Sequence, residues 1–443
     1  MTFDHETLPL LAEALKDLDA GFDRLPEVTP RVDVEGIRRV LNEVAERLRD
    51  NYPYQHPQYI GQMLKPPHPV ARLAYSLAMF VNPNNHAMDG GRASSRMEKE
   101  AVAGLARMVG WEEHLGHLCS GGTMANFEAL WVARELQPGK AVAASSQAHY
   151  THSRLSSVLQ VPFHPVPVDA RGRMDVDALE KLLQSESIGT VVVTLGTTAA
   201  GTVDPLDRIL PLREKYGFRL HVDAAYGGYF RLVEDLREET ARAFAAIPAV
   251  DSVVIDPHKH GLQPYGCGCV LFRDPSVGRI YRHDSPYTYF TSDELHLGEI
   301  SLECSRPGAA AVALWATQQL LPPVRGGEFA AGLEQGRAAA LELHEWLSGD
   351  SRFVPLMEPE LDIVVWAMWA ETASESSRRA RAFFAEAERR DVYLALASFP
   401  RGMVEPAGAV GDWDDESVVC LRACAMKPEH REWMRAIAGR LEA

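Results

Sequence analysis

Long hydrophobic segments are missing from this sequence. No apolar run approaches the roughly 18 residues that a membrane-spanning helix requires. The chain begins with acidic residues where a secretion signal begins with basic ones, and its first apolar residues are spaced rather than continuous. We therefore expect a cytoplasmic protein without a membrane anchor.

Cysteine and basic charge are also scarce. The 443 residues include six cysteines, and neither Cys267 with Cys269 nor Cys420 with Cys424 has the spacing of a zinc site. We expect buried free thiols and no bound metal.

The 45 basic residues are outnumbered by 61 acidic ones, which gives a net charge of −16. A chain with this balance is not expected to bind nucleic acid or anionic lipid non-specifically.

The sequence does contain ample core-forming material. Apolar residues make up 46% and charged residues 24%, as in globular proteins, and the length predicts two or three domains. Proline- and aromatic-rich loops begin at about Tyr52, and the composition changes again after residues 322–323. We divide the chain into an N-terminal helical arm (residues 1–54), a large domain (55–325) and a smaller C-terminal α+β domain (326–443).

Two amphipathic helices are predicted for the arm, because leucines and β-branched residues recur there at helical spacing. Their apolar faces must pack on something, since such faces are not stable in water. They either cover their own subunit or form an arm that is exchanged with a second subunit. The two apolar stripes are Leu8, Leu11, Leu15 and Leu18, and Ile37, Val40, Leu41, Val44 and Leu48.

A third helix is predicted after the loop region. Ser95 and Glu98 have the spacing of a capping box, the apolar residues from Met97 to Met108 recur on one face, and Gly110 ends the pattern. We expect the helix to start at this box.

The centre of the chain alternates short apolar runs with helical stretches, from AVAAS at 141–145 to CGCVLF at 267–272. Apolar strands separated by helices predict a mostly parallel sheet that is covered on both faces, with its ligand at the carboxyl ends of the strands. In the last part of the chain, a helix at 328–347 precedes an alternating strand at 361–367.

A glycine-rich turn opens one of the predicted central helices. Ser120, Gly121, Gly122 and Thr123 precede the helical stretch FEALWVAREL, so backbone N–H groups, the positive end of the helix dipole and two hydroxyls lie together. This arrangement suits a phosphate, although a plain helix N-cap has a similar sequence. It is neither a P-loop nor a dinucleotide fingerprint, because the lysine of the first and the glycine spacing of the second are absent.

Three further groups follow other predicted strands. Asp223 ends the strand-like run 219–222, where it could bind a metal, cap a helix or pair with a buried cation. Lys259 follows the strand 253–255 and lies between two histidines, and nearby cations and partial burial favour the neutral amine that forms Schiff bases. His149 follows AVAAS, from which its ring could stack on a flat cofactor or act as an acid or base. A surface lysine and a structural histidine are the alternatives.

Together, a phosphate cradle, a carboxylate, a lysine and a stackable ring predict one cofactor, pyridoxal 5′-phosphate. Its aldehyde condenses with a lysine, its phosphate suits a helix N-terminus, and a carboxylate keeps its pyridine nitrogen protonated. The protonated ring is the electron sink that stabilises a carbanion. The combination is far more specific than any single motif.

The motifs HVDAAYGG, DPHKHG, SGGTMAN, QAHYTHS and TLGTTAAGTVDP resemble those of the group II pyridoxal-phosphate-dependent amino acid decarboxylases, the family of the aromatic-L-amino-acid, histidine and glutamate decarboxylases. The resemblance spans about Tyr52 to Pro307 and continues weakly near Arg422. It implies a fold-type I α/β architecture, with a mostly parallel seven-stranded sheet in the large domain. It also implies a homodimer with active sites at the subunit interface and an exchanged N-terminal arm.

The resemblance also implies roles for individual residues. Lys259 is the Schiff-base lysine, Asp223 the partner of the pyridine nitrogen, and His149 the ring that stacks on the cofactor. The other cofactor-binding positions that it implies are Gly122, Thr123, Thr194, Ala225, Asp256 and His258.

The activity implied by the resemblance is decarboxylation of an L-amino acid to the amine and CO2. In the family, a tyrosine on a mobile loop returns a proton to the carbon after CO2 has left. Tyr287 and Tyr289 lie in the equivalent region, and either of them, or His149, could serve. Simple packing of this aromatic-rich loop is the alternative for each tyrosine.

Departures from the family pattern leave the outcome of the reaction open. His260 stands where aromatic decarboxylases usually have tryptophan, and Met124 where an acidic residue is common. The segment 304–308 is more similar to that of sphingosine-phosphate lyases and of bacterial glutamate or methanogen tyrosine decarboxylases. A carbon–carbon (aldehyde) lyase, a decarboxylating aldehyde synthase and a non-enzymatic scaffold are therefore the rival hypotheses.

The substrate side chain is predicted from the residues expected at the pocket walls, partly from a second subunit. These residues are aromatic or polar rather than basic, which favours an aromatic substrate over glutamate. They are Tyr54, His56, Phe80 and His86. Against this preference, three arginines could reach a side-chain carboxylate. They are Arg92, Arg96 and Arg306.

Overall fold

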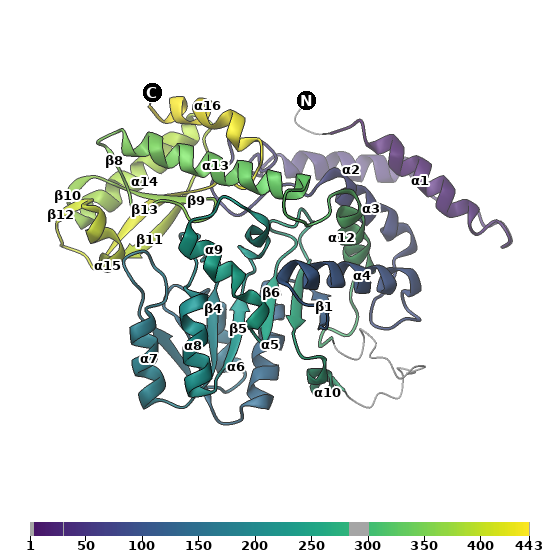
Figure 1. Ribbon diagram of the computed structural model, residues 1–443. Helices are drawn as coiled ribbons and strands as arrows, with labels where there is room; N and C mark the ends of the chain where they lie inside the picture. The colour runs from purple at the N-terminus through teal and green to yellow at the C-terminus, as the bar shows by residue number, and fades with distance from the viewer. Residues whose placement is uncertain (1–3, 30, 283–300, 443) are drawn as a thin grey trace.

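The computed structural model describes residues 4–29, 31–282 and 301–442. A seven-stranded sheet with helices on both faces forms the larger part of the molecule, and a four-stranded sheet with its own helices packs against it (Figure 1). A two-stranded sheet adjoins the smaller part. This arrangement confirms the predicted α/β fold class.

The strands of the large sheet are β1 (Leu115–Cys119), β2 (Ala141–Ser145), β3 (Phe163–Val166), β4 (Ile188–Thr194), β5 (Arg219–Asp223), β6 (Ser252–Ile255) and β7 (Gly268–Phe272). Their spatial order is β1-β7-β6-β5-β4-β2-β3. Strand β7 runs antiparallel to its neighbours β1 and β6, and the other neighbouring pairs are parallel. The prediction of a mostly parallel, seven-stranded sheet is confirmed.

Strand β1 is an element that the sequence patterns did not predict. It is an edge strand of five residues, its first two residues are only partly buried, and it contains Gly116 and His117. It therefore lacks the β-branched run that identified the central strands.

Helices cover both faces of this sheet, and short 3₁₀ turns join several of them. The helices are α3 (Pro69–Val81), α4 (Arg92–Val109), α5 (Gly122–Leu136), α6 (Thr151–Val158), α7 (Val176–Ser185), α8 (Leu206–Tyr216), α9 (Glu238–Ala245), α10 (Gly278–Tyr281) and α12 (Gly308–Leu320). The turns are Gly228–Leu232, Ile247–Ala249 and Pro275–Val277.

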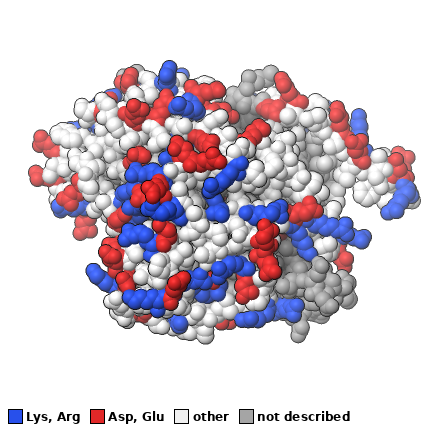
Figure 2. All heavy atoms as spheres, in the orientation of Figure 1, with Lys and Arg blue, Asp and Glu red and all other residues white. Residues whose placement is uncertain are grey.

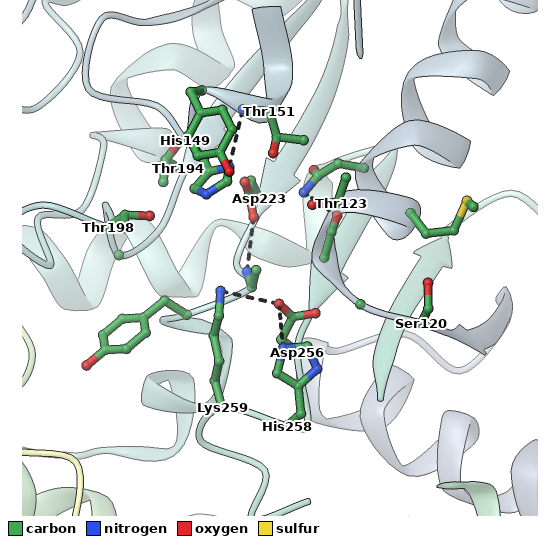
Figure 3. A pocket seen from close by; sticks show the side chains of 18 residues that line it. Ser120, Thr123, His149, Thr151, Thr194, Thr198, Asp223, Asp256, His258 and Lys259 are labelled. Atoms are coloured by element: carbon green, nitrogen blue, oxygen red, sulfur yellow. Dashed lines mark hydrogen bonds and ion pairs between the residues drawn. The ribbon is translucent and has the colours of Figure 1, made fainter. Parts of the chain in front are cut away.

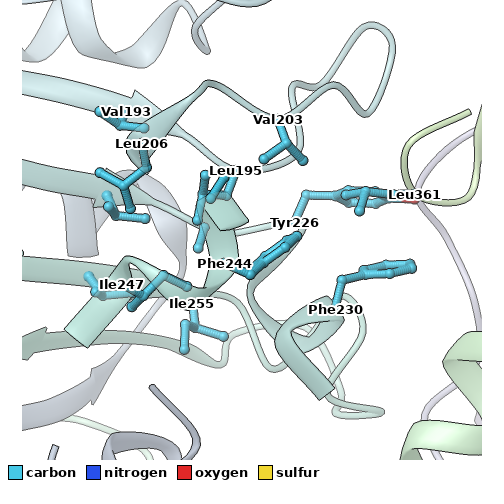
Figure 4. Close-up of a cluster of buried hydrophobic side chains, with 14 of the residues drawn as sticks. Val193, Leu195, Val203, Leu206, Tyr226, Phe230, Phe244, Ile247, Ile255 and Leu361 are labelled. Carbon is cyan, nitrogen blue, oxygen red and sulfur yellow. The ribbon is translucent and has the colours of Figure 1, made fainter. Parts of the chain in front are cut away.

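The main hydrophobic core lies between the sheet and these helices. All seven residues of β4 are buried, and Val193 and Leu195 pack with Leu206, Phe244 and Ile255 from neighbouring segments (Figure 4). Burial of such side chains contributes about 1.5–3 kcal/mol each. The core therefore fixes the carboxyl ends of the central strands, where the polar residues begin.

The predicted start of helix α4 was wrong. The helix begins at Arg92 with Gly91 as its N-cap, so Ser95 and Glu98 lie inside it. Glu98 accepts hydrogen bonds from the Leu118 N–H (2.9 Å) and from Arg306 (2.6 Å) instead of capping the helix. The predicted end was right, because Gly110 adopts φ +91°, which a glycine tolerates at a helix C-terminus.

The smaller part of the molecule is built on the sheet β11-β13-β9-β8. Its strands are β8 (Phe353–Pro355), β9 (Ile363–Met368), β11 (Ala395–Pro400) and β13 (Ser417–Cys424), and β10 (Ala370–Thr372) pairs with β12 (Val410–Asp412). Its helices are α13 (Glu328–Ser348), α14 (Ala373–Arg389), α15 (Arg401–Val404) and α16 (His430–Glu442), with a 3₁₀ turn at Glu405–Ala407.

Strand β9 has two buried faces. Ile363, Val365 and Ala367 belong to the main core, whereas the alternate residues Val364 and Trp366 belong to a second core among the small-sheet helices. The residues that alternate along the sequence at 361–367 therefore point into two different cores, rather than alternately into a core and into solvent.

The two predicted arm helices are present as α1 (Leu8–Ala20) and α2 (Val34–Leu48), and neither contains a buried residue. Helix α1 projects from the body of the molecule (Figure 1). The apolar side chains of α2 are 44–60% exposed. They are Val34, Ile37, Val40, Leu41, Val44 and Leu48. Of the two alternatives left open for the arm, cover of its own subunit is therefore not seen for the apolar face of α2 in the single chain.

Within the part of the chain that the structure describes, no helix combines the length and apolar character that crossing a bilayer would demand. The same residues include no group of three or more His, Cys, Asp or Glu arranged to hold a metal ion. On the face drawn in Figure 2, basic and acidic side chains are intermixed.

Candidate active site

A cavity of about 370 Å³ lies at the carboxyl ends of the central strands. The segments that follow β1, β2, β4, β5 and β6 all contribute to it, as the rule for parallel sheets predicts. Every predicted cofactor-binding residue lines this cavity, and Figure 3 shows several of them converging on it. These residues are Gly122, Thr123, His149, Thr194, Asp223, Ala225, Asp256, His258 and Lys259.

Lys259 reaches the cavity from the turn after β6. Its Nζ lies 3.2 Å from Oδ2 of Asp256, one helical turn earlier in the sequence, and the same oxygen lies 3.5 Å from Nε2 of His258 (Figure 3). Burial lowers the pKa of His258, although the Asp256 charge opposes this shift. The charged group nearest to the lysine is thus a carboxylate rather than the flanking histidines that the sequence emphasised.

Asp223, at the end of β5, is buried, and each of its two carboxylate oxygens accepts one hydrogen bond. Its Oδ2 accepts from Nε2 of His152 at 2.8 Å, and its Oδ1 accepts from the Ala225 N–H at 3.1 Å. Burial opposes its ionisation, but the hydrogen bond and charge of His152, together with the charge of Lys259, outweigh burial and hold the pKa of Asp223 well below its usual range. The site therefore contains a permanent buried anion.

His149 follows β2 and lies on the opposite side of the cavity from Lys259 (Figure 3). Its Nδ1 accepts a hydrogen bond from the Thr151 N–H at 3.3 Å, which fixes the plane of the ring. Burial lowers the pKa of His149, against the opposing charge of Asp223. A neutral, oriented imidazole of this kind suits stacking on a flat ring.

The glycine-rich turn is shaped for close approach. A Cβ on Gly122 would lie 2.7 Å from Oδ2 of Asp256, and one on Gly268 in β7 would lie 2.5 Å from the backbone of Gly121. The turn therefore brings the first N–H groups of α5, which have no partner within the helix, to the rim of the cavity. The Ser120 N–H is already engaged, because it donates to Glu303 Oε2 at 2.9 Å.

Neighbouring side chains hold this helix terminus against the sheet. Asn126 donates to the Gly122 carbonyl at 2.8 Å and is joined through its amide oxygen to Nε2 of His221, also at 2.8 Å. The other ring nitrogen of His221 contacts Ser252 Oγ at 2.8 Å, and burial lowers the pKa of this histidine to about 3. A neutral imidazole thus links β5 and β6 to the start of α5.

The donors and acceptors of the cavity fit pyridoxal phosphate. A helix N-terminus offers hydrogen-bond donors to a phosphate, a buried carboxylate offers an acceptor to a protonated ring nitrogen, and a primary amine offers a nucleophile to an aldehyde. Three lining residues also have buried polar atoms without a partner in the described part of the chain. These atoms are Thr194 Oγ1, Asp256 Oδ1 and His258 Nδ1.

Some residues that the sequence suggested for the substrate lie elsewhere. The predicted wall residues Tyr54, His56, Phe80 and His86 do not line the cavity in this chain. Arg306 was predicted as a possible partner for a substrate carboxylate, but it is buried and already bound to Glu98. Arg92 and Arg96 are exposed on α4 and do not line the cavity. Tyr287 and Tyr289 lie outside the described residues.

Sequence reasoning also missed several residues that the fold brings here. Tyr150, Thr198 and Tyr226 line the cavity, and His152 binds Asp223 from behind it. The motif QAHYTHS contains this second histidine, and a turn in which the His152 N–H donates to the His149 carbonyl at 3.0 Å places it at the start of α6, but no local pattern indicated its pairing with Asp223.

The chain matches the "Pyridoxal-dependent decarboxylase conserved domain" over residues 35–368. The chain belongs to this family. Its curated relatives include an L-tyrosine decarboxylase of Enterococcus faecium, which is 30% identical over 76% of this chain and 73% of its own length. An L-aspartate decarboxylase of Thermococcus kodakarensis is 29% identical over 82% of this chain and 92% of its own length.

Solved structures have the same fold as this decarboxylase. Mouse CSAD superposes with a TM-score of 0.78 at 21% identity and covers 97% of this chain and 91% of its own. Oryza sativa TDC, solved with PLP and tryptamine, has a TM-score of 0.79 at 16% identity and covers 100% of this chain and 99% of its own. The fold is therefore that of the fold-type I enzymes, and the chain is a pyridoxal-phosphate-dependent amino acid decarboxylase, a lyase.

Proposed function

We propose that the enzyme removes CO2 from an aromatic L-amino acid and releases the corresponding amine. The observation that carries this proposal is the chemistry of the cavity lining. Among the described residues that line it, Lys259 is the only lysine or arginine, and Tyr150 and Tyr226 offer aromatic surface. A substrate with a second carboxylate would need a cation for that group, whereas an aromatic side chain would not.

We propose the following residue roles, which the family pattern implies and the contacts in the cavity support. Lys259 would hold the cofactor through Nζ, and Asp256 orients that amine from 3.2 Å. Gly122, Thr123 and His258 would bind the phosphate, and His149 and Ala225 would contact the ring. Thr194 lines the cavity, and its buried hydroxyl, which has no partner among the described residues, is available to the cofactor.

When bound, pyridoxal phosphate supplies a protonated ring that withdraws the electrons of the broken bond between Cα and the carboxylate. Asp223 holds the proton at the ring nitrogen, because its own pKa lies too low for it to take that proton away. His152 maintains this state by donating to the other carboxylate oxygen. Tyr287, Tyr289 or His149 returns a proton to Cα.

The substrate assignment is tested by comparing kcat/KM for CO2 release from L-tyrosine, L-tryptophan and L-aspartate. We expect an aromatic amino acid to be preferred by at least about tenfold, since a buried unpaired carboxylate costs more than 1.4 kcal/mol. A preference for L-aspartate would reject the aromatic assignment without affecting the decarboxylase activity. An aldehyde product without CO2 would point to carbon–carbon cleavage, and hydrogen peroxide with ammonia would point to the aldehyde synthase.

The covalent attachment has its own experiment. Borohydride reduction of the holoenzyme, followed by digestion and mass spectrometry, should find the cofactor on the peptide that contains Lys259. The Lys259→Ala variant should carry no label and should lack absorbance near 400 nm. A label on any other lysine would contradict the assignment.

We also propose that the enzyme is a homodimer, with the exposed apolar face of α2 packed on a second copy. The stripe from Val34 to Leu48 is too regular and too exposed to remain in water. We place the dimer in the cytoplasm, because all six cysteines are free, and five of them are buried.

A further inference from the structure

A second cavity, of about 380 Å³, lies between the segment that precedes α3, helix α13 and the turn that precedes α16. We call it the lysine cavity, because Lys65 and Lys427 both line it, together with His260, Phe329 and Leu333. None of its lining residues lines the cofactor cavity. Neither the proposed chemistry nor the substrate assignment makes use of it.

No carboxylate is in direct contact with either lysine in the described part of the chain, and only the more distant charges of Asp362 and Glu429 oppose theirs. Lys427 is 4% exposed, and its Nζ donates to the Tyr59 carbonyl at 2.6 Å. Lys65 donates to the Met426 carbonyl at 3.2 Å. Neither forms an ion pair within 4.0 Å among the residues described. Lys427 Nζ also lies 5.3 Å from the centroid of the Tyr59 ring. Neither the carbonyl groups nor this ring neutralises the charge, so a buried ammonium is held here at a cost in free energy.

The lysines also affect each other and their neighbours. Burial lowers the pKa of Lys65 to about 8 and that of Lys427 to about 7, and the charge of Lys65 adds to the second shift. The two positively charged amines therefore repel each other across the cavity that both of them line. An anion that accepts hydrogen bonds from both amines would reduce this repulsion and supply a countercharge in direct contact with them.

The rest of the lining narrows the class of anion. Phe329, Leu333 and Leu262 offer apolar contact, so the ligand should have a compact hydrocarbon body. Glu328 and Glu429 are exposed and line the same cavity, so a multiply charged ligand would meet repulsion. We propose that the lysine cavity binds a small monocarboxylate with an apolar body, whose carboxylate accepts hydrogen bonds from Lys65 and Lys427.

This position places the ligand behind the catalytic lysine. His260, which is 1% exposed, lines the lysine cavity and directly follows Lys259 in the chain. Its ring contacts that of Tyr226 at 4.7 Å between centroids, and Tyr226 lines the cofactor cavity. Asp362 completes the wall, since it accepts from the Tyr226 hydroxyl at 2.6 Å and lies 3.3 Å from His260 Nε2. The ligand would therefore contact a wall that the two cavities share.

The test uses the holoenzyme with benzoate as the carboxylate probe and inorganic phosphate as the multiply charged comparison. Isothermal titration calorimetry should show saturable benzoate binding that is weakened at least about tenfold in Lys65→Met and in Lys427→Met, which keep the apolar stem but lose the charge. Lys181→Met, at an exposed position on α7, is the matched control and should bind benzoate as the wild type does. Glu429→Gln should bind benzoate at least as tightly as the wild type.

Three outcomes would overturn the proposal. The first is the absence of saturable benzoate binding to the wild-type holoenzyme. The second is unchanged affinity in both lysine variants, which would locate the ligand elsewhere, for example in the cofactor cavity. The third is binding of phosphate in preference to benzoate. Retained absorbance near 400 nm in each variant verifies that the cofactor site is intact, so a failure here leaves the decarboxylase assignment untouched.

Discussion

At the scale of single residues, the ionised state of Asp223 depends on His152. A buried carboxylate ordinarily resists ionisation, and here a hydrogen bond of 2.8 Å from the imidazole reverses that tendency. The sequence motif identified the carboxylate and its place at the end of a strand. It did not identify the histidine, because the pairing joins residues 71 positions apart through the packing of α6 on the sheet.

Replacement of Asp223 by asparagine should lower kcat for CO2 release by about 10²–10³-fold, the range found when one preorganised electrostatic partner is removed. The amide keeps the shape of the side chain but cannot hold a proton at the ring nitrogen. KM should change far less than kcat. A variant with nearly normal kcat would contradict the proposed role of Asp223.

Replacement of His152 by leucine should have a smaller effect in the same direction, about 10-fold or more on kcat, because Asp223 would remain but with a raised pKa. His152→Gln retains a donor and should recover part of the loss. The pH profile separates this positioning role from simple packing. As the pH is lowered, kcat should begin to fall at a higher pH in the leucine variant than in the wild type, because the raised pKa lets Asp223 take up a proton earlier. The glutamine variant should not show this shift. Equal losses in both variants would argue for packing.

Lys427 gives a prediction about stability and pH. Its pKa is lowered to about 7 in the folded state, from an ordinary value of 10.5, so the folded protein holds fewer protons than the unfolded chain between these values. Wild-type stability from this group therefore rises with pH across that window. Lys427→Met should be more stable than the wild type at pH 6, and this advantage should shrink towards pH 9.

Thermal unfolding of the two holoenzymes at both pH values, without added carboxylate, measures this difference. The shift should be a few degrees at most, because about 1 kcal/mol moves the Tm of a long chain by roughly 2 °C or less. If the methionine variant is less stable at pH 6, the lysine has a structural role that its burial does not reveal.

At the scale of elements, the start of α5 depends on glycines that allow close approach. Gly122→Ala would push a methyl group against Oδ2 of the buried Asp256, at 2.7 Å. We expect at least about tenfold weaker binding of pyridoxal phosphate, measured by absorbance titration, because the helix terminus must shift. Gly439→Ala is the control, since a Cβ there meets nothing within 4 Å and should leave cofactor affinity unchanged.

The sequence predicted most elements where one physical signal dominated. The continuous apolar runs of β2, β4, β5 and β6 identified buried parallel strands, and their order along the chain brought the polar residues to one edge. It failed where tertiary contacts decided the outcome. Glu98 has the spacing of a capping residue, but it satisfies the Arg306 guanidinium 208 positions away, and no local pattern reports that pairing.

At the scale of the whole molecule, the exposed face of α2 predicts the oligomeric state. Leu41→Glu on this face should convert the proposed dimer to a monomer in analytical ultracentrifugation, since burying an unpaired charge in an apolar interface costs several kcal/mol. Activity should fall with dissociation if the second subunit supplies wall residues such as Phe80. Glu35→Gln, on the same helix, should remain dimeric. A wild-type monomer would reject the dimer proposal.

The predicted walls illustrate what one chain cannot reveal about a shared site. Phe80 is 64% exposed and lies away from the cofactor cavity of its own chain, so sequence similarity alone suggested its role. Lys259, Asp223 and His149 could be predicted, because they lie at strand ends within one sheet. Pocket walls that a second copy of the chain contributes could not be predicted in this way.

Strand β9 has a consequence for how this chain could be recombined with its relatives. Its odd-numbered residues from Ile363 to Ala367 fill one core, and its even-numbered residues from Val364 to Met368 fill the other. Consider first a chimera that is native up to a crossover immediately before β9. Its foreign β9 would present a foreign set of side chains to the native large sheet. In a chimera that is native only after a crossover immediately behind β9, the foreign strand would instead face the native small-sheet helices that follow it, α14 and α16. Viable hybrids should therefore need compensating changes on whichever side receives the foreign strand.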